Sequence, residues 1–164
     1  MSLPRIVVDN SAILPAYFPE AEHAAFDAKL VTNRARALVH RILMGRVKAF
    51  VPPSFYREFL NVSTLPLYAH DGRGRNPEQL RRIRAQWDDL LLLPLIVVPL
   101  GQILHHSGTL AFDDGCPAAD AWYVAAAVHS QATLWISHAH SDDLLAAASK
   151  HVSVRLLARH TVEY

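Results

Sequence analysis

The sequence predicts an α/β fold in which a central parallel sheet of five strands lies between two layers of helices. Five short apolar segments alternate along the chain with segments of helical periodicity, a pattern typical of parallel sheets. The expected strands are Arg5–Val8, Lys48–Val51, Ile96–Val98, Thr133–Ser137 and Val152–Leu156. A length of 164 residues fits a single domain, 1–164. The 51% of hydrophobic and 19% of charged residues exclude a disordered chain.

The expected helices fill the intervals between these strands. They cover residues 12–18, 19–47 with a break near Thr32 and Asn33, 52–64, 77–92, 100–110, 117–130 and 142–150. Pro52 and Pro53 favour a helix start, because proline suits the first turn of a helix. The segment 117–130 is apolar on all sides, which predicts a buried helix.

Several classes of protein are excluded or disfavoured by the composition. The longest apolar run, Leu90–Leu100, contains two prolines and is much shorter than the roughly 20 residues of a membrane span. The N-terminal residues do not resemble a signal peptide. The one cysteine, Cys116, can form neither an intramolecular disulfide nor a cysteine-rich zinc site. We therefore expect a cytoplasmic protein without a membrane partner.

The charges are unevenly distributed, although the net charge is only +1. Ten of the 16 Lys and Arg residues fall within 34–48 and 73–84, where Glu78 is the only acid. Residues 85–149 contain seven acids and no Lys or Arg. This asymmetry predicts a surface that binds a polyanion, beside an acidic pocket. The alternative is that the basic segments are ordinary helix faces exposed to solvent. The candidate RNA-binding residues are Arg34, Arg36, Arg41, Arg73 and Arg75.

Acidic residues follow several of the expected strands, and in parallel sheets ligands bind beyond the carboxyl ends of the strands. Asp9 comes directly after the first strand, and Glu58 lies in the helix after the second. Asp120 is the only charged residue between Ala118 and Val128. Asp142 and Asp143 follow the fourth strand. Each of these acids could instead have a purely structural role, as a helix cap, an exposed glutamate or an acid that faces a helix dipole.

Asp120 is the strongest single indication of a functional site. An unpaired carboxylate in an apolar helix costs several kcal/mol unless a partner or a metal ion meets it. Carboxylates that gather without cations repel one another, and a hard divalent ion removes that repulsion. Oxygen ligands favour Mg²⁺ or Mn²⁺ over Zn²⁺. Such ions activate water and stabilise a displaced phosphoryl group, so the pattern indicates phosphodiester hydrolysis.

The ordered set of motifs resembles the PIN domain, the nuclease fold of VapC-like toxins and related ribonucleases. Four segments carry the resemblance: Ile6–Ser11 (IVVDNS), Val51–Glu58 (VPPSFYRE), Asp120–Ala127 (DAWYVAAA) and Leu134–Ser137 (LWIS). Their order and spacing agree over nearly the whole chain. The resemblance implies a three-layer α/β/α sandwich with the strand order 3-2-1-4-5.

The resemblance also implies a set of site residues. Asp9, Glu58 and Asp120 would be catalytic metal ligands, with Ser11 orienting Asp9. The fourth acid of the family falls at Ala139 here, and Asp142 is the candidate to replace it as catalytic metal ligand. This departure puts catalytic strength in doubt.

The leading hypothesis is a Mg²⁺- or Mn²⁺-dependent endoribonuclease that is the toxin of a type II toxin–antitoxin pair. Its candidate partners are RNA, a small antitoxin protein and a second copy of the chain in a homodimer. A catalytically weakened RNA-binding or scaffold protein is the alternative that Ala139 suggests. A phosphohydrolase of small molecules is a third, although Ser11 stands where haloacid dehalogenases have a second Asp.

Five other residues have structural interpretations. His138 and His140 lie close to the expected pocket and are interpreted mainly as loop histidines. Tyr123 and its neighbour Trp122 are expected in the core. Cys116 has no clear base nearby in the sequence and is interpreted as a packing residue.

Overall fold

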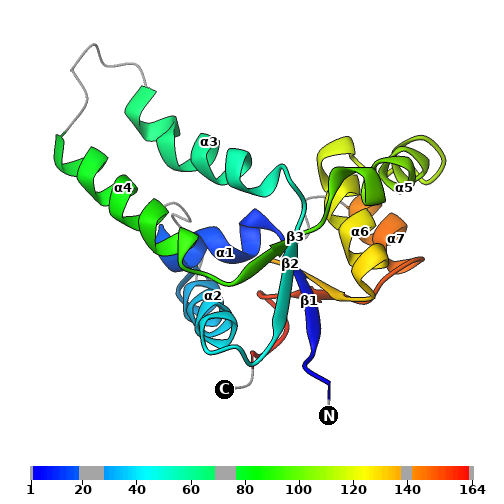
Figure 1. Cartoon of the computed structure of the whole chain (residues 1–164), viewed down its shortest axis with the longest axis horizontal. Coiled ribbons are helices and arrows are strands. Elements are labelled where there is room, and N and C mark those ends of the chain that lie inside the picture. Colours follow the sequence, from blue (N-terminus) through cyan, green and yellow to red (C-terminus); the bar gives the residue numbers. More distant parts are fainter. Residues whose placement is uncertain (1, 19–27, 69–76, 138–141, 163–164) are drawn as a thin grey trace.

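A computed structural model of the chain describes residues 2–18, 28–68, 77–137 and 142–162. Within these ranges the side chains of residue 28, residues 65–68 and residues 142–143 are not described. The described part forms a sheet with helices on both faces (Figure 1). None of its helices has both the length and the apolar character that a membrane span requires.

The sheet contains five strands in the order β3-β2-β1-β4-β5, and all four neighbouring pairs are parallel. The strands are β1 (Arg5–Val8), β2 (Lys48–Val51), β3 (Leu95–Val97), β4 (Thr133–Ile136) and β5 (Val154–Leu156). The predicted fold class and strand order are therefore confirmed. The central strand is β1, whose apolar residues Val7 and Val8 are fully buried, as expected for a strand covered on both faces.

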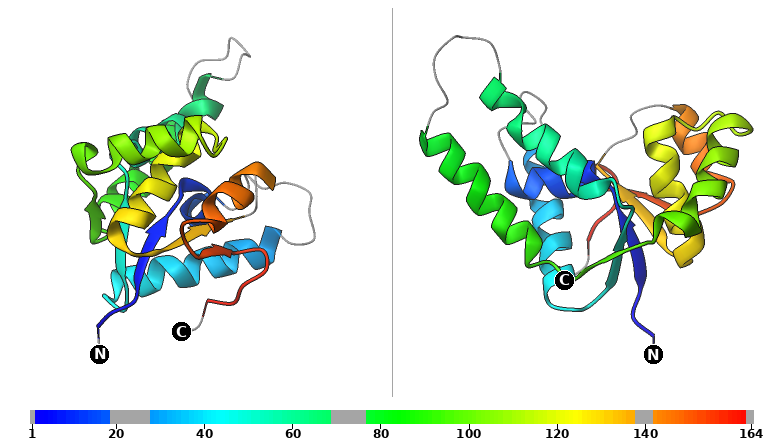
Figure 2. Two further views of the ribbon diagram at one scale, coloured as in Figure 1. Left: turned by 90° about the vertical axis from the view of Figure 1, so that its right-hand side faces the viewer. Right: turned by 45° about the horizontal axis from the view of Figure 1, so that its top comes forward.

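Seven helices of the described residues connect the strands. They are α1 (Asn10–Tyr17), α2 (Ala28–Leu43), α3 (Phe55–Tyr68), α4 (Pro77–Leu91), α5 (Leu100–Phe112), α6 (Ala118–Ser130) and α7 (Asp142–Ser149). α1 to α4 lie on one side of the sheet and α5 to α7 on the other (Figures 1 and 2). This division follows from right-handed crossovers, because the chain first moves from β1 toward β3 and then returns toward β5.

The helix break expected near Thr32 and Asn33 is wrong, because α2 runs without interruption through both residues. Its buried stripe explains this result. The stripe repeats at helical spacing and consists of Val31, Ala35, Leu38 and Ile42. Burial of such a stripe outweighs the modest helix propensity of Thr and Asn. The expected helical residues 19–27 lie outside the described part.

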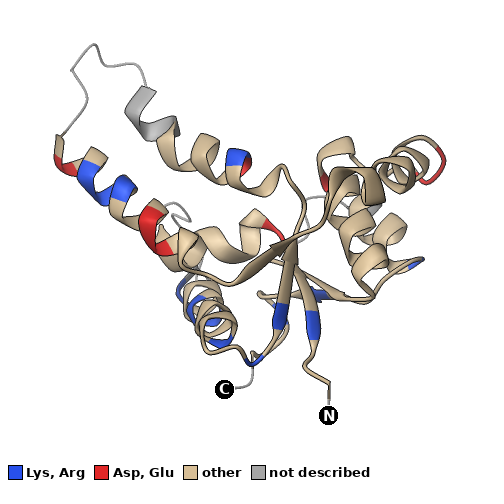
Figure 3. Ribbon diagram, in the orientation of Figure 1, with Lys and Arg blue, Asp and Glu red and all other residues tan. Residues whose placement is uncertain are grey.

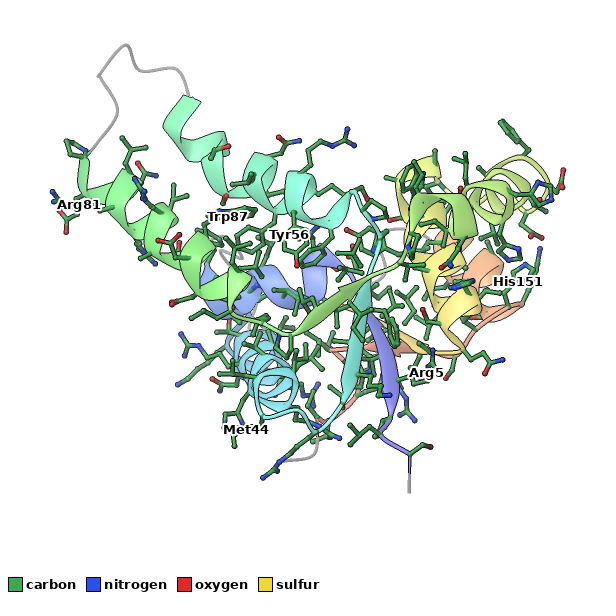
Figure 4. The ribbon with its side chains drawn as sticks, in the orientation of Figure 1. Arg5, Met44, Tyr56, Arg81, Trp87 and His151 are labelled. Carbon is green, nitrogen blue, oxygen red and sulfur yellow. The ribbon has the colours of Figure 1, made fainter. Side chains whose placement is uncertain are left out.

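An aromatic cluster fixes α3 against α1 and α4. Trp87 of α4 packs edge-on to Tyr56 at 6.0 Å between ring centroids and contacts Phe59 at 6.2 Å. Tyr17 of α1 also packs against Phe59, at 5.8 Å between ring centroids. Figure 4 shows Tyr56 and Trp87 between the two helices. The cluster thereby holds the helix that carries Glu58.

We expect Phe59→Ala to lower the free energy of unfolding by about 3–5 kcal/mol, because it removes a fully buried ring and leaves a cavity. Urea denaturation measures this change. Phe112→Ala is the matched control, since its ring is 89% exposed and its loss should alter stability by less than about 0.5 kcal/mol. Equal losses in the two variants would contradict the role assigned to the cluster.

Candidate functional site

Asp9 lies at the carboxyl end of the central strand and is only 8% exposed. Its backbone N–H donates to the Trp135 carbonyl of β4 at 3.0 Å. Its side-chain Oδ2 accepts from the Ser11 N–H at 3.1 Å and from the Ser11 hydroxyl. The same hydroxyl accepts from the Ser137 N–H at 3.1 Å. Ser11 therefore has the contacts expected of a residue that orients Asp9, and Asp9 also caps α1.

Asn10 connects α1 with α3 and α6. Its Nδ2 contacts the Phe55 carbonyl at 3.0 Å, Glu58 Oε2 at 3.2 Å and the Tyr123 hydroxyl at 2.9 Å. The Tyr123 hydroxyl in turn donates to Glu58 Oε2 at 2.5 Å. Three acceptors around one NH₂ group determine the orientation of the amide, because its oxygen would be repelled there. Glu58 is therefore held by two donors from two different helices.

The opposite atom of the same amide, Asn10 Oδ1, is buried and has no hydrogen-bond partner among the described residues. A buried acceptor in this condition costs free energy, and native proteins usually satisfy it with a donor, a water molecule or an ion. The residue between Asp9 and Ser11 therefore carries a buried oxygen without a hydrogen-bond partner among the described residues.

The Tyr123 hydroxyl is hydrogen-bonded to Glu58 and is also subject to the charge of Asp9. Its side chain is 3% exposed, and this burial is the main cause that raises the pKa of the Tyr123 hydroxyl far above its usual value. The negative charge of Asp9 raises this pKa further, as do the hydrogen bond to Glu58 and the charge of that residue. One hydroxyl thus senses both carboxylates, which come from positions 9 and 58 of the chain.

Asp120 lies in the first turn of α6, three residues before Tyr123 and hence on the same helix face. Its own charge acts on Cys116, where burial comes first in raising the thiol pKa to about 11, followed by Asp120 and Asp114. A thiol with this pKa is protonated at neutral pH, as expected of a packing residue. Asn10, the neighbour of Asp9, and Tyr123 therefore connect Glu58 to the end of β1, and Asp120 lies on the same helix as Tyr123.

The expectation that α6 is buried on all sides is wrong for its first turn. Ala118 and Ala119 are exposed and Asp120 is half-buried, whereas Ala121 and residues 123–127 are buried. Trp122, which was expected in the core, is half-buried and packs against it. The first turn of α6 follows the buried Cys116, and Asp120 within this turn is in contact with solvent. The desolvation argument for Asp120 is therefore weaker than the sequence suggests, and the helix dipole contributes to its stability there.

Acidic residues at the starts of α1, α3 and α6 lie toward the edge of the sheet where the strands end (Figure 3). Of the side chains that the structure describes, no group of three or more His, Cys, Asp or Glu residues is placed to hold a metal ion. The Asp142 and Asp143 side chains, and residues 138–141 with Ala139, His138 and His140, are outside the described part. The complete ligand set consequently stays a prediction.

The predicted RNA-binding arginines occupy different places. Arg34 is half-buried, and its Nη1 donates to the Leu157 carbonyl after β5 at 2.6 Å, so it helps to hold α2 against the sheet. Arg36 is exposed on α2, whereas Arg41 lines a cavity at the amino ends of the strands. Arg73 and Arg75 lie outside the described residues. Further along the second basic segment, Arg81 lies near the far end of α4 (Figure 4).

Asn10 and the hydroxyl of Tyr123 were missed as site residues by the sequence analysis. A signal was available for Tyr123, because a tyrosine in an apolar helix needs a hydrogen-bond partner for its hydroxyl. For Asn10 the signal was weaker: it stands between Asp9 and Ser11 at a helix start, where asparagine is ordinarily a capping residue.

Comparisons with known proteins give a structural likeness. No protein-family model matches the chain, and no curated protein matches it. The crystal structure of PAE2754 from Pyrobaculum aerophilum superposes with a TM-score of 0.56 at 18% sequence identity, covering 92% of this chain and 83% of that one. At this identity the likeness shows a shared fold.

We expect Tyr123→Phe to lower stability at neutral pH by about 1 kcal/mol, because Glu58 loses a donor. The difference in stability between the parent and the variant should shrink above pH ~10. There an unfolded tyrosine releases its proton while buried Tyr123 keeps it, so the parent loses stability as the pH rises. Urea denaturation of both proteins from neutral to alkaline pH measures the effect. Parallel pH dependence of parent and variant would contradict it.

Proposed function

We propose that the protein is a Mg²⁺- or Mn²⁺-dependent endoribonuclease of the PIN-domain type, acting in the cytoplasm as the toxin of a toxin–antitoxin pair. The observation that carries the proposal is the hydrogen-bonded group of Glu58, Tyr123 and Asn10, which stands directly beside Asp9 at the carboxyl end of the central strand. In sheets of this kind the ligand binds at that end. Asp120, on the same face of α6 as Tyr123, supplies a third acid.

The donor chemistry of the site suits a hard divalent cation. The candidate ligands Asp9, Glu58 and Asp120 offer only oxygen atoms, which Mg²⁺ and Mn²⁺ prefer. Asn10, which holds Glu58 through its Nδ2, also has a buried Oδ1 that could accept from a water molecule bound to such a cation. Asp142 remains the candidate to replace the fourth acid of the family, because Ala139 occupies the usual position of that acid. When bound, the cation would lower the pKa of a water molecule and stabilise charge on the phosphoryl group.

The chain's own residues prepare the site. Ser11 and the cap of α1 fix the Asp9 carboxylate, so that it does not rotate away when no cation is present. Asn10 and Tyr123 fix Glu58 in the same way from two helices. This preorganisation lowers the entropic cost of assembling carboxylates that repel one another. Exposed cations on α2 and α4 would hold the phosphate backbone of the RNA.

A protein partner is part of the proposal. Large apolar side chains are exposed on consecutive parts of the chain, from the end of α4 through the edge strand β3 into α5. They are Leu91, Leu92, Ile96, Val97, Leu100 and Leu104, and Leu92 is 72% exposed. Exposed apolar surface of this kind favours contact with another protein chain. A small antitoxin or a second copy of the chain would cover it.

A catalytically weakened RNA-binding protein is the second candidate, and Ala139 favours it because that position lacks the fourth acid. The two candidates differ in turnover. Binding of RNA by the parent without cleavage in either Mg²⁺ or Mn²⁺ would favour the second candidate.

We expect Asp120→Asn to abolish RNA cleavage while the fold is retained. Without metal the variant should melt no lower than the parent, because one repelling charge is removed. Added Mg²⁺ should raise the melting temperature of the parent more than that of the variant, in proportion to metal occupancy. Asp113→Asn is the matched control, since Asp113 is an exposed acid at the C-cap of α5 and is not among the proposed ligands, so this change should leave both readouts unchanged. Cleavage by Asp120→Asn at the parent's rate would refute the site.

RNA affinity should fall steeply with salt concentration if the basic segments bind the phosphate backbone. We expect Arg36→Glu and Arg75→Glu each to reduce the slope of log affinity against log salt by about 0.7, the contribution of one phosphate contact to a single strand. Titrations in the Asp120→Asn background avoid cleavage. Arg159→Glu, an equal charge change at an exposed arginine outside both segments, should leave the slope unchanged. Equal slopes in all proteins would mean that these segments are merely solvated.

A further inference from the structure

The contacts of Glu58 engage only one of its two carboxylate oxygens. The Tyr123 hydroxyl of α6 donates to Glu58 Oε2 at 2.5 Å, and Asn10 Nδ2 of α1 lies 3.2 Å from the same atom. Among the described residues, no hydrogen bond or ion pair reaches Oε1. One oxygen of this carboxylate is therefore held by the protein, and the other remains for a ligand.

Two donors fill the acceptor positions of Oε2. A carboxylate oxygen has about two lone-pair positions. The Tyr123 proton takes one of them through the shorter contact. Asn10 shares its amide protons among three acceptors and approaches the other. A cation can bind Oε2 only if it displaces one of these donors.

Such a displacement is costly because both donors are buried. Tyr123 is 3% exposed and Asn10 is 6% exposed. The Tyr123 hydroxyl accepts from Asn10 Nδ2 at 2.9 Å and donates its own proton to Glu58. A hydroxyl proton that lost Glu58 would stay buried without an acceptor. Glu58 can therefore offer Oε1 to a cation far more easily than it can offer both oxygens.

Asp9 is restricted in a similar way. Its Oδ2 accepts from both the N–H and the hydroxyl of Ser11. These two donors fill the lone-pair positions of Oδ2, as Tyr123 and Asn10 do at Glu58. Two of the proposed metal ligands thus oppose binding of one cation through both oxygens of the same carboxylate.

We propose that Tyr123, assisted by Asn10, makes the site selective for Mg²⁺ or Mn²⁺ over Ca²⁺. The inference rests on the function proposed above, in which Glu58 is a metal ligand. Ca²⁺ takes about 6–8 oxygen ligands and commonly binds a carboxylate through both oxygens. Mg²⁺ requires a near-octahedral set, keeps several water molecules and needs only one or two carboxylates. Mn²⁺ accepts the same octahedral oxygen ligation. Carboxylates that offer one oxygen each satisfy the smaller ions and leave Ca²⁺ short of ligands.

The test is a calorimetric titration of the full chain with MnCl₂ and, separately, with CaCl₂. We expect the parent to bind Mn²⁺ more tightly than Ca²⁺. Tyr123→Phe frees one lone-pair position of Oε2, so the ratio of the two affinities should shift toward Ca²⁺ by about fivefold, the usual effect of one hydrogen bond.

Tyr56→Phe is the matched control. It removes a tyrosine hydroxyl from α3, the helix that carries Glu58, and leaves the ring that packs against Trp87. Its affinity ratio should differ from that of the parent by less than about twofold. Asp120→Asn should weaken Mn²⁺ binding, which identifies the titrated site as the proposed one.

Three results would overturn this inference and leave the proposed function standing. They are equal affinities of the parent for Mn²⁺ and Ca²⁺, an unchanged ratio in Tyr123→Phe, and an equal shift in Tyr123→Phe and Tyr56→Phe. Absence of Mn²⁺ binding by the parent, or binding that Asp120→Asn leaves unchanged, would overturn both. Selective Mn²⁺ binding without RNA cleavage would overturn the nuclease proposal and support the inference.

Discussion

The three consecutive residues after β1 make hydrogen bonds that connect the central strand to elements on both faces of the sheet. Asp9 binds the backbone of β4, Asn10 binds α3 and α6, and Ser11 binds the residue that follows β4. The central position of β1 makes this possible, because the ends of its neighbours β2 and β4 and the starts of the following helices surround it. A change in this turn would therefore disturb the contacts to β4, α3 and α6 together.

The same turn resolves a physical conflict. Asp9 and Glu58 carry like charges near one buried hydroxyl, an arrangement that costs free energy without a cation. Hydrogen bonds from Ser11, Asn10 and Tyr123 offset part of that cost and hold each carboxylate in one orientation. Structural cost concentrated at one place, with local compensation, is typical of functional sites.

The two edges of the sheet differ in charge. Acids lie at the carboxyl ends of the strands, and arginines lie around the cavity at the amino ends. The parallel topology produces this separation, because every strand begins at one edge and ends at the other. Acids placed just after strands therefore gather at one edge, while cations just before or within strand starts gather at the other.

The sequence by itself determined the α/β class, the approximate strand limits and the acids that follow β1 and β2, because buried parallel strands are short apolar runs that local pattern reveals. The strand order came from the resemblance of the ordered motifs. Only the tertiary structure decided the rest. It brought Tyr123 and Asn10 to Glu58, which lies 65 residues from the first and 48 from the second along the chain. It kept α2 continuous through Thr32 and Asn33. It also left Asp120 half-exposed and engaged Arg34 with the backbone after β5. Each of these depends on which surfaces pack together, and contacts between distant segments leave no periodic signal in the sequence that a local reading can detect.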